Sequence, residues 1–573
     1  MTDQEQHTGP TLEISEFLDK TKYRQEGETF RQKCNRIADS LKDSEEHFQA
    51  FKEILLAQKF LPAGRVQSAM GAAKQVTPYN CFVSGTIPDS MPGIMDAAKE
   101  AAETMRLGGG IGYDFSTLRP RGDLISRTGS PSSGPVSFMR IFDAVCSTVA
   151  SAGHRRGAQM GVLRIDHPDV EEFIRAKQNK DNLTQFNVSL GITDKFMEAV
   201  QLDQPFDLIF KTRVYKTVSA KNLFNEIMRS TWDWAEPGVL FIDRINEYNN
   251  LYYCETIAAT NPCAEQPLPP YGACLLGSFN LVKYVRRLDD GWVVFDVEAF
   301  KKDIPIIVRA MDNIVDRALY PLAQQKAEAQ GKRRMGIGVT GVANALEAAG
   351  LQYGSEKFLS TLEDILRVLT NECYRASAYL AKEKGSFPQF DKEKYLKSKF
   401  VQERLDEEVQ DLISTIGIRN SHLTSVAPTG TISLIADNVS SGIEPVYEYE
   451  TSRIIQMFDG PIVSHFQDYG KRVFFKLGKR ADECTVDEHL SVLLVAAKWM
   501  DSAVSKTCNV GDSVTFDEFK DIYFKAWKGG AKGCTTFRKA GKRMGIFVPT
   551  APQEGEGAAC YFDPETGTKS CDT

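Results

Sequence analysis

Apolar residues recur at helical spacing in three long stretches of the chain. The clearest stripe lies before the glycine run at 108–110 and comprises Ile94, Ala97, Ala98, Ala101 and Met105. This i, i+3, i+4 spacing predicts a helix that the glycines end. Two more helices are predicted, one starting at Pro135 and one over residues 355–384. Cys146 and Cys373 fall on their apolar stripes, so we expect both to be packing residues.

Short β-branched runs between the helices predict strands at residues 206–209, 293–295, 424–427 and 431–435. Strands interleaved with helices predict an α/β fold. Residues 1–55 are polar, with short amphipathic helices at 11–18 and 30–41, and form a lead-in to the main body. Residues 549–573 are rich in glycine, proline and acidic residues, as in a mobile tail.

Composition and charge exclude several classes of protein. A chain of 573 residues with 42% hydrophobic and 25% charged residues forms one large barrel or several globular domains. The net charge of -7 disfavours a nucleic-acid partner. No stretch approaches 18 consecutive apolar residues and the start is polar, so we expect a cytoplasmic protein with no membrane partner.

The spacing of cysteines, histidines and glycines indicates which cofactor sites the chain lacks. Twelve cysteines without a regular framework fit a reducing compartment. The seven histidines show no spacing typical of zinc ligands, so we expect no metal bound by this chain. The glycine run at 108–112 follows a helix, whereas a dinucleotide-binding fingerprint follows a strand, and we reject an NAD site.

The segment from residue 260 to 281 carries the candidate chemistry. Its adjacent prolines exclude a helix. In an extended stretch, Asn261, Cys263 and Glu265 point to one side together, which places an amide, a thiol and a carboxylate in one site. From these residues alone, a loop with a buried cysteine and a solvated glutamate remains an equal alternative.

The sequence NPCAEQPLPPYGACLLGSFNL resembles the finger-loop signature of ribonucleotide reductases. Further motifs follow in the order of that family, namely Asn80-Cys81-Phe82, Arg106 to Gly112, Ala152 to Ala158, Ala427 to Ser433 and Ser441 to Pro445. The resemblance implies a ten-stranded α/β barrel with a central finger loop that carries a thiyl cysteine. It divides the chain into a lead-in (1–55, without an ATP cone), the barrel (56–545) and a C-terminal redox tail (546–573). The implied function is reduction of ribonucleotides to 2′-deoxyribonucleotides for DNA synthesis, and the compact chain resembles phage-encoded members.

The resemblance also implies residue roles. Cys263 carries the thiyl radical, Glu265 is the general base and Asn261 binds the substrate hydroxyls. Loss of the 2′-hydroxyl as water needs two electrons, which the thiols of Cys81 and Cys274 supply by forming a disulfide. Cys560 and Cys571 are the tail shuttle that reduces this pair again, and a thioredoxin- or glutaredoxin-type reductant restores the shuttle. Their spacing is wider than is usual in the family.

Nucleotide contacts follow from the same resemblance. Substrate binding is assigned to Asn80, Gly110, Thr429, Gly430, Thr431 and Ser433. A deoxynucleotide or ATP effector at a homodimer interface is assigned to Asp89, Ser90, Arg119 and Arg156. Ordinary surface charge is the alternative for these four residues. Whether the substrate is a diphosphate or a triphosphate stays open.

Two alternatives exist for the radical source. Thr535-Thr536 stand where reductases with a radical-generating small subunit have two tyrosines, which resembles the adenosylcobalamin-dependent class. The compact chain favours a metal-containing partner subunit, which we expect, with adenosylcobalamin as the alternative. Tyrosines 252, 253, 447 and 449 are either other relays or packing residues. Rival classes are a glycyl-radical enzyme, which the context of Gly545 matches poorly, and a nucleotide-binding regulator, which needs no set of three cysteines.

Overall fold

The computed structural model describes residues 9–125, 129–149, 158–179, 181–457, 460–538, 560–563 and 568–571. Three helices open the chain: α1 (Glu13–Lys22) and α2 (Phe30–Leu41), which correspond to the two predicted helices of the lead-in, and α3 (Glu45–Leu56), which was not predicted. Thr29 and Gln32 form a capping box at the start of α2, and the Ser44 side chain caps α3. These caps fix where both helices begin.

The largest sheet has eight strands in the order β11-β2-β3-β4-β5-β8-β19-β18. Neighbours from β2 to β8 are parallel, and so are β19 and β18, while the β11–β2 and β8–β19 pairs are antiparallel. Two parallel runs of opposite direction therefore meet at β8 and β19. The strands are β2 (Cys81–Val83), β3 (Gly110–Asp114), β4 (Gln159–Arg164), β5 (Phe186–Ile192), β8 (Gly238–Phe241), β11 (Ala273–Cys274), β18 (Thr507–Val510) and β19 (Gly533–Arg538).

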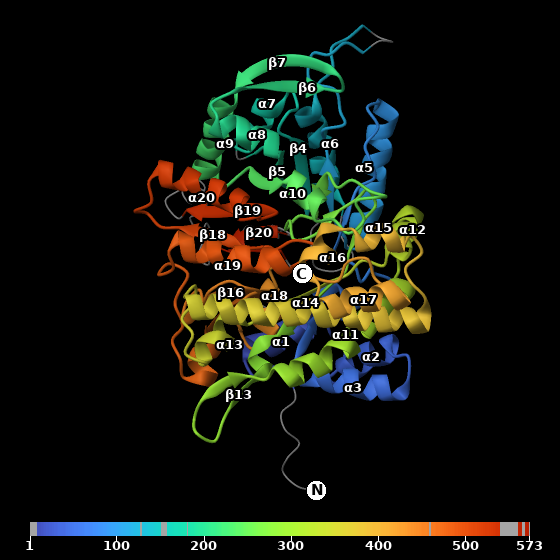
Figure 1. Cartoon of the computed structure of the whole chain (residues 1–573), viewed down its shortest axis with the longest axis vertical. Coiled ribbons are helices and arrows are strands. Elements are labelled where there is room, and N and C mark those ends of the chain that lie inside the picture. Colours follow the sequence, from blue (N-terminus) through green and yellow to red (C-terminus); the bar gives the residue numbers. More distant parts are fainter. Residues whose placement is uncertain are drawn as a thin grey trace.

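Helical crossovers connect the parallel strands, as parallel pairing requires. Figure 1 shows these helices gathered with β6 and β7 at one end of the molecule and α1 to α3 at the other. The predicted helices before the glycine run and after Gly134 are confirmed as α5 and α6, and Cys146 is buried as expected. The crossover elements are α5 (Met91–Arg106), α6 (Pro135–Thr148), α7 (Val170–Arg175), α8 (Asp194–Gln201), β6 (Pro205–Phe210), β7 (Arg213–Ser219) and α9 (Ala220–Trp234).

A second sheet joins β1 (Phe60–Pro62), β12 (Leu276–Asn280) and β15 (Gly336–Thr340) in that order with β12 central. Single bridges continue from its edge, from Ile337 to Thr424 and from Val426 to Val504, just before β18. At the other end, β11 and β12 follow one another in the chain. The fold is α/β, as predicted, although the described strands do not form one closed sheet.

The prediction of a strand at 431–435 is wrong. Residues Gly430–Ile435 form the short helix α18. Thr429, at φ 55°, turns the chain so that its carbonyl accepts a bond from the amide of Ser433 at 2.8 Å. Local turn geometry outweighs the β-branched composition here.

Long helices pack side by side next to the sheets. α11 (Val297–Arg317) packs against α14 (Glu356–Lys384), α14 against α19 (Val486–Trp499), α19 against β18, and α20 (Phe516–Lys528) against β19. α14 confirms the predicted helix at 355–384, and Cys373 is fully buried on it. None of the helices among the described residues has the length and apolar character needed to cross a membrane.

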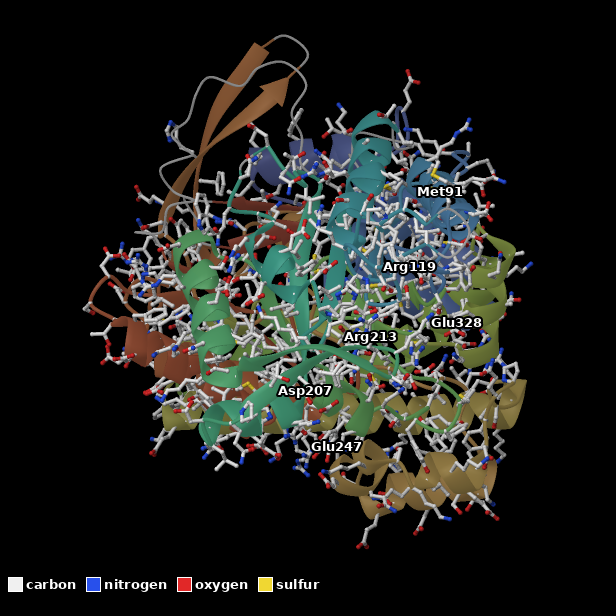
Figure 2. All side chains as sticks on the ribbon, turned by 90° about the horizontal axis from the view of Figure 1, so that it is seen from above. Met91, Arg119, Asp207, Arg213, Glu247 and Glu328 are labelled. Atoms are coloured by element: carbon white, nitrogen blue, oxygen red, sulfur yellow. The ribbon has the colours of Figure 1, made fainter. Side chains whose placement is uncertain are left out.

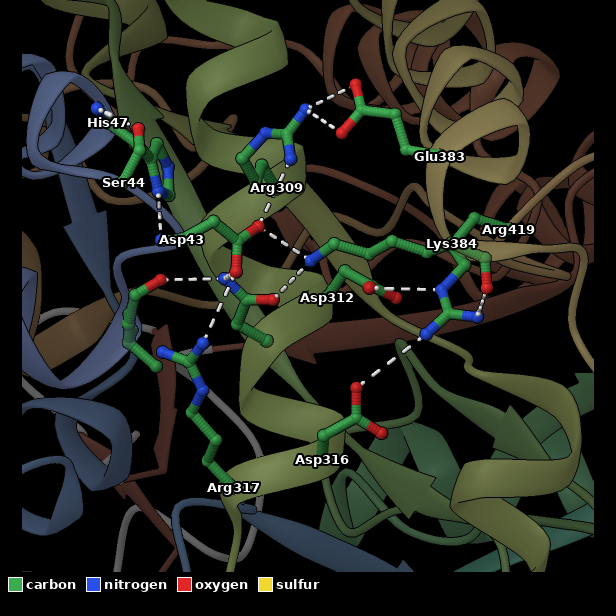
Figure 3. A network of polar contacts seen from close by, with 12 residues as sticks. Asp43, Ser44, His47, Arg309, Asp312, Asp316, Arg317, Glu383, Lys384 and Arg419 are labelled. Atoms are coloured by element: carbon green, nitrogen blue, oxygen red, sulfur yellow. Dashed lines mark hydrogen bonds and ion pairs between the residues drawn. The ribbon is translucent and has the colours of Figure 1, made fainter.

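An ionic network ties the lead-in to this helical layer (Figure 3). Asp43, between α2 and α3, accepts bonds from Arg309 at 3.1 Å, Lys384 at 2.6 Å and Arg317 at 3.3 Å. Asn313 donates to the same carboxylate at 2.9 Å. One carboxylate thus connects the first helices with α11 and α14.

Candidate active site

The candidate catalytic residues lie at the tip of a β-hairpin. Strand β9 (Ala259–Thr260) pairs with β10 (Pro267–Leu268), and residues 261–266 connect them. The tip is a turn: the Asn261 carbonyl accepts from the Ala264 amide at 3.0 Å, and Ala264 has φ 69°. The expected strand-like alternation of Asn261, Cys263 and Glu265 is therefore wrong, because a tight turn replaces it. All three residues are buried.

Two glycines allow this finger to cross β3. A Cβ added at Gly112 would lie 1.8 Å from the carbonyl oxygen of Thr260. One added at Gly110 would lie 3.3 Å from Pro262 and 3.2 Å from the sulfur of Cys81. The glycine run is thus the passage for the finger, since backbone approach this close excludes a side chain.

Hydrogen bonds from distant segments fix the finger. The Glu265 carbonyl accepts from the hydroxyl of Ser425 and from the amide of Ala503, both at 2.9 Å. Asn187 on β5 donates to the carbonyl of Pro262 at 3.3 Å. Sequence reasoning missed Ser425 and Asn187, because no motif marks a residue that supports a loop 160 or 75 positions away in the chain.

Cys81 and Cys274 are direct partners across the antiparallel strands β2 and β11. Both are buried, and neither is in a disulfide. Burial, followed by the nearby Cys81 and Glu265, raises the pKa of the Cys274 thiol well above its usual value. Directly opposed residues in such a pair have Cβ atoms about 4.5–5.5 Å apart, within reach of a disulfide after small adjustment.

Two buried amides beside these thiols lack partners among the described residues. Both side-chain amide atoms of Asn80 and the Nδ2 of Asn261 have no hydrogen-bond partner, and the two residues are at most 1% exposed. Buried polar groups are ordinarily satisfied. Amides can donate to and accept from hydroxyls, so this pair suits a polyhydroxylated ligand.

Cys263 lines a cavity of about 50 Å³ on the side of β5, β8, β18 and β19. Much of its wall comes from small or hydroxyl side chains, including Gly238, Ser505, Gly533, Thr535 and Thr536. No aromatic residue is among the described lining residues. The sulfur of Cys263 is in a disulfide bond in the structure, so radical chemistry at this atom requires its prior reduction.

The loop at 427–433 meets the segment at 441–445. The Thr429 hydroxyl accepts from the amide of Gly442 at 2.7 Å and lies 2.9 Å from the hydroxyl of Thr340. Ser433 and Ser441 hydroxyls are 2.9 Å apart. The structure therefore brings together two motifs that the sequence alone could only place in order.

The predicted effector residues are partly assembled. Arg119 donates to Asp89 at 3.0 Å, and the Ser90 hydroxyl accepts from the amide of Gly93 and caps α5. Figure 2 shows Arg119 and the start of α5, marked by Met91, on one side of the molecule. Met91 is 58% exposed. Arg156 lies outside the described residues.

Strands β20 (Cys560–Asp563) and β21 (Thr568–Cys571) form a hairpin in which Cys560 and Cys571 are direct partners. The wide sequence spacing of these cysteines thus corresponds to adjacent backbone positions. The hydroxyls of Tyr252 and Tyr253 donate to carbonyls of Lys394 and Gln389, and neither ring lines the Cys263 cavity. In the described part of the chain, no group of three His, Cys, Asp or Glu side chains could hold a metal ion.

A family model and several curated proteins are similar to this chain, and they agree on one family. The family model described as ribonucleotide reductase, barrel domain, matches residues 79–537. A Mycobacterium tuberculosis protein named "Vitamin B12-dependent ribonucleoside-diphosphate reductase" is 35% identical over 82% of this chain and 69% of its own length. A Thermoplasma acidophilum protein of the same name is 31% identical over 92% and 72%. A Chlamydia pneumoniae "Ribonucleoside-diphosphate reductase subunit alpha" is 24% identical over 79% and 51%.

The family match spans the finger hairpin, the Cys81–Cys274 pair and the loop at 427–433. The Mycobacterium tuberculosis and Thermoplasma acidophilum relatives cover 82% and 92% of the chain and are both named as ribonucleoside-diphosphate reductases. The chain belongs to the ribonucleotide reductase family and is a catalytic subunit that reduces ribonucleotides.

Proposed function

We propose that the two sheets are parts of one ten-stranded barrel around the finger, extending over residues 56–545. The bridges from β15 through Thr424 and Val426 to Val504 support this, because they connect the second sheet to β18. At the other edge, β11 runs into β12. Residues 1–55 are then a lead-in and residues 546–573 a redox tail.

Within this barrel, Cys263 is the thiyl cysteine that takes the 3′-hydrogen of the substrate. Glu265 accepts the proton of the 3′-hydroxyl, and Asn261 holds the substrate hydroxyls together with Asn80. The orphaned amides of the two asparagines support these roles, because a ribose offers the partners they lack. Gly110 leaves room for the nucleotide, and Thr429, Gly430, Thr431 and Ser433 bind its phosphates.

The dithiol of Cys81 and Cys274 supplies the two electrons. The 2′-hydroxyl leaves as water, both thiols lose their hydrogens, and an S–S bond forms, so one ribonucleotide and two thiols give one deoxyribonucleotide, one disulfide and one water. The cross-strand register supports this assignment. The raised pKa of Cys274 keeps that thiol protonated at neutral pH, as a hydrogen donor requires.

For the radical source we propose adenosylcobalamin rather than the partner subunit that the compact sequence favoured. The observation that carries this choice is the wall of the Cys263 cavity, where Thr535 and Thr536 stand and no aromatic ring is found among the described lining residues. A tyrosine relay needs rings at that place. When bound, the cofactor supplies a radical equivalent by homolysis of its cobalt–carbon bond. The relatives named vitamin B12-dependent support the same choice.

Reduction of labelled CDP and CTP by the purified protein tests this proposal. The assay contains dithiothreitol and an effector deoxynucleotide, with and without adenosylcobalamin. We expect product only with the cofactor, and preferentially from CDP, since two relatives are named diphosphate reductases. Cys263→Ser should abolish product and keep nucleotide binding, whereas Cys254→Ser, at an exposed cysteine, should stay active. Product that requires an added metal-containing subunit would overturn the choice of cofactor.

For the tail we propose that Cys560 and Cys571 re-reduce the barrel disulfide. Their cross-strand register in the β20–β21 hairpin supports a single dithiol. In the double variant Cys560→Ser/Cys571→Ser, turnover with a thioredoxin-type reductant should stop, while turnover with dithiothreitol continues because a small thiol reaches the barrel directly. Equal loss with both reductants would refute a shuttle role.

We further propose a homodimer that binds its effector deoxynucleotide near Asp89, Ser90, Arg119 and Arg156. The exposed methionines 91 and 95 on α5 support an interface on this side of the molecule (Figure 2). Arg119→Ala should weaken effector binding and leave reduction of CDP without effector unchanged. Equal effector affinity in the variant and the parent would remove Arg119 from the site.

A further inference from the structure

Helix α1 of the lead-in packs directly against α18, the helix that continues the phosphate loop. The lead-in lies outside the family match, which begins at residue 79. Its contact with α18 joins positions more than 400 residues apart in sequence. In Figure 1 both helices lie in the same lower part of the molecule.

Asp437, two residues after α18, caps the start of α1. Its carboxylate accepts the amides of Thr11 at 2.7 Å and Leu12 at 2.9 Å, and the Thr11 hydroxyl at 2.8 Å. α1 has no side-chain cap of its own at Leu12. A carboxylate at a helix N-terminus is stabilising, because the first amides are unsatisfied and the helix dipole is positive there. Asp437 is 4% exposed, so these bonds are shielded from water.

Ser15 of the lead-in, together with Gln58 just after it, caps α18 in return. The hydroxyl of Ser15 donates to the carbonyl of Leu434 at 2.6 Å, and the Gln58 amide donates to the carbonyl of Ile435 at 3.2 Å. These carbonyls belong to the last turn of α18, where backbone acceptors need outside partners. Ile14, Leu434 and Phe466 form a small separate core that closes the contact.

A helix of six residues has little stability of its own, because helix nucleation is costly and short helices depend on packing. The position of α18 is therefore determined by what holds its two ends. At its start, Thr429 is held by Thr340 and Gly442. At its end, the partners are Ser15, Gln58 and the Asp437 cap.

We propose that the lead-in, through Ser15 and Asp437, is a positioning device for the nucleotide-phosphate loop and thereby sets the affinity for the ribonucleotide. The proposal rests on the assignment of Thr429 to Ser433 as the phosphate loop. Ser15 and Asp437 do not touch the reacting atoms. They act by keeping α18 seated, so that the loop at its start holds the geometry that binds substrate.

Asp437→Asn keeps the size of the side chain and removes its charge. We expect the KM for CDP to rise about fivefold or more, the lower range of ordinary coupling between distant sites. Because the radical site is untouched, kcat should change less than about twofold. Ser15→Ala should give a smaller rise in KM. Lys20→Ala, at an exposed position on the other face of α1, is the matched control and should match the parent.

Two further measurements separate the possible outcomes. Thermal melting and effector affinity report whether a variant is folded, and amide hydrogen exchange reports the protection of residues 430–435, which should fall in Asp437→Asn. Thr431→Val tests the loop itself. If Thr431→Val raises KM but Asp437→Asn and Ser15→Ala do not, the positioning role is refuted while the loop assignment stands. If none of the three variants changes KM, the assignment of the phosphate loop is refuted, and the positioning role that rests on it is refuted too.

Discussion

Gly112→Ala is the sharpest test of the finger geometry. The added Cβ would lie 1.8 Å from the Thr260 carbonyl oxygen, whereas ordinary carbon–oxygen contacts begin at about 3.3 Å. The carbonyl must therefore move by about 1.5 Å, three residues before Cys263. A displacement of about 1 Å at a reacting group can reduce the rate about 100-fold, so we expect at least that loss in kcat.

Gly191→Ala is the matched control, on strand β5 of the same sheet. Its added Cβ would meet nothing closer than 3.8 Å, an ordinary contact. Steady-state reduction of CDP gives kcat, nucleotide binding gives the affinity, and thermal melting reports the cost of overpacking, about 1–3 kcal/mol. Gly110→Ala, with contacts of 3.2–3.3 Å, should be intermediate. If folded Gly112→Ala kept more than about a third of the parent kcat, the finger would not depend on this passage.

Three further predictions concern the dithiol, the partly exposed carboxylate of Asp43 and the buried carboxylate of Glu347. Cys274→Ser should bind CDP normally and form no product over many turnovers with dithiothreitol; repeated turnover would exclude the dithiol role of the Cys81 pair. Asp43→Asn should lower the free energy of unfolding by about 1 kcal/mol at neutral pH, because three cations lose a shared carboxylate that is partly exposed to solvent. Burial raises the pKa of Asp43, but bonds from Lys384 and Arg309 outweigh it and hold the pKa below its usual value. The stability that the Asp43 carboxylate contributes is therefore fully present above its pKa in the unfolded chain, about 3.9. It is lost as pH falls through the lower pKa of the folded state, so denaturant melts of parent and variant should converge in acid. Burial raises the pKa of Glu347 to about 7, although backbone bonds from Lys479 and Tyr353 act in the opposite direction. The free energy of unfolding should therefore fall as pH rises from about 4.5 to 7. Glu347→Gln should remove this pH dependence in melts across the range, and an unchanged dependence would contradict the raised pKa.

The sequence predicted the helices well because their apolar stripes coincide with the faces that the fold buries. Cys146 and Cys373 were correctly assigned to the core for the same reason. The α/β class followed from the interleaving of strands and helices. Residues 431–435 were misjudged, because three of the five are β-branched, as in a strand, and the left-handed Thr429 that starts a helix leaves no composition signal.

The candidate site was predicted as a set of residues but not as a shape. The motif supplied Asn261, Cys263 and Glu265, yet the turn at Ala264 could not be read from a segment rich in prolines. Ser425 and Asn187 were missed since their role depends on contacts across the whole chain. The register that opposes Cys560 and Cys571 depends on the pairing of β20 with β21, which sequence spacing alone does not define.

The cross-strand pairing of Cys81 and Cys274 has a consequence for how the enzyme cycles. Opposed residues in an antiparallel pair have Cα atoms about 4.5–5.5 Å apart, and a disulfide needs about 4.4–6.8 Å. The backbone thus accommodates the reduced pair and, after small adjustment, the oxidised pair. In the proposed role of this pair, the disulfide forms between two buried side chains, so we expect its formation to change the surface of the protein little. Recovery then depends on the proposed tail dithiol, which is tethered to the same chain, so the first regeneration should be independent of the concentration of external reductant and later ones should rise with it.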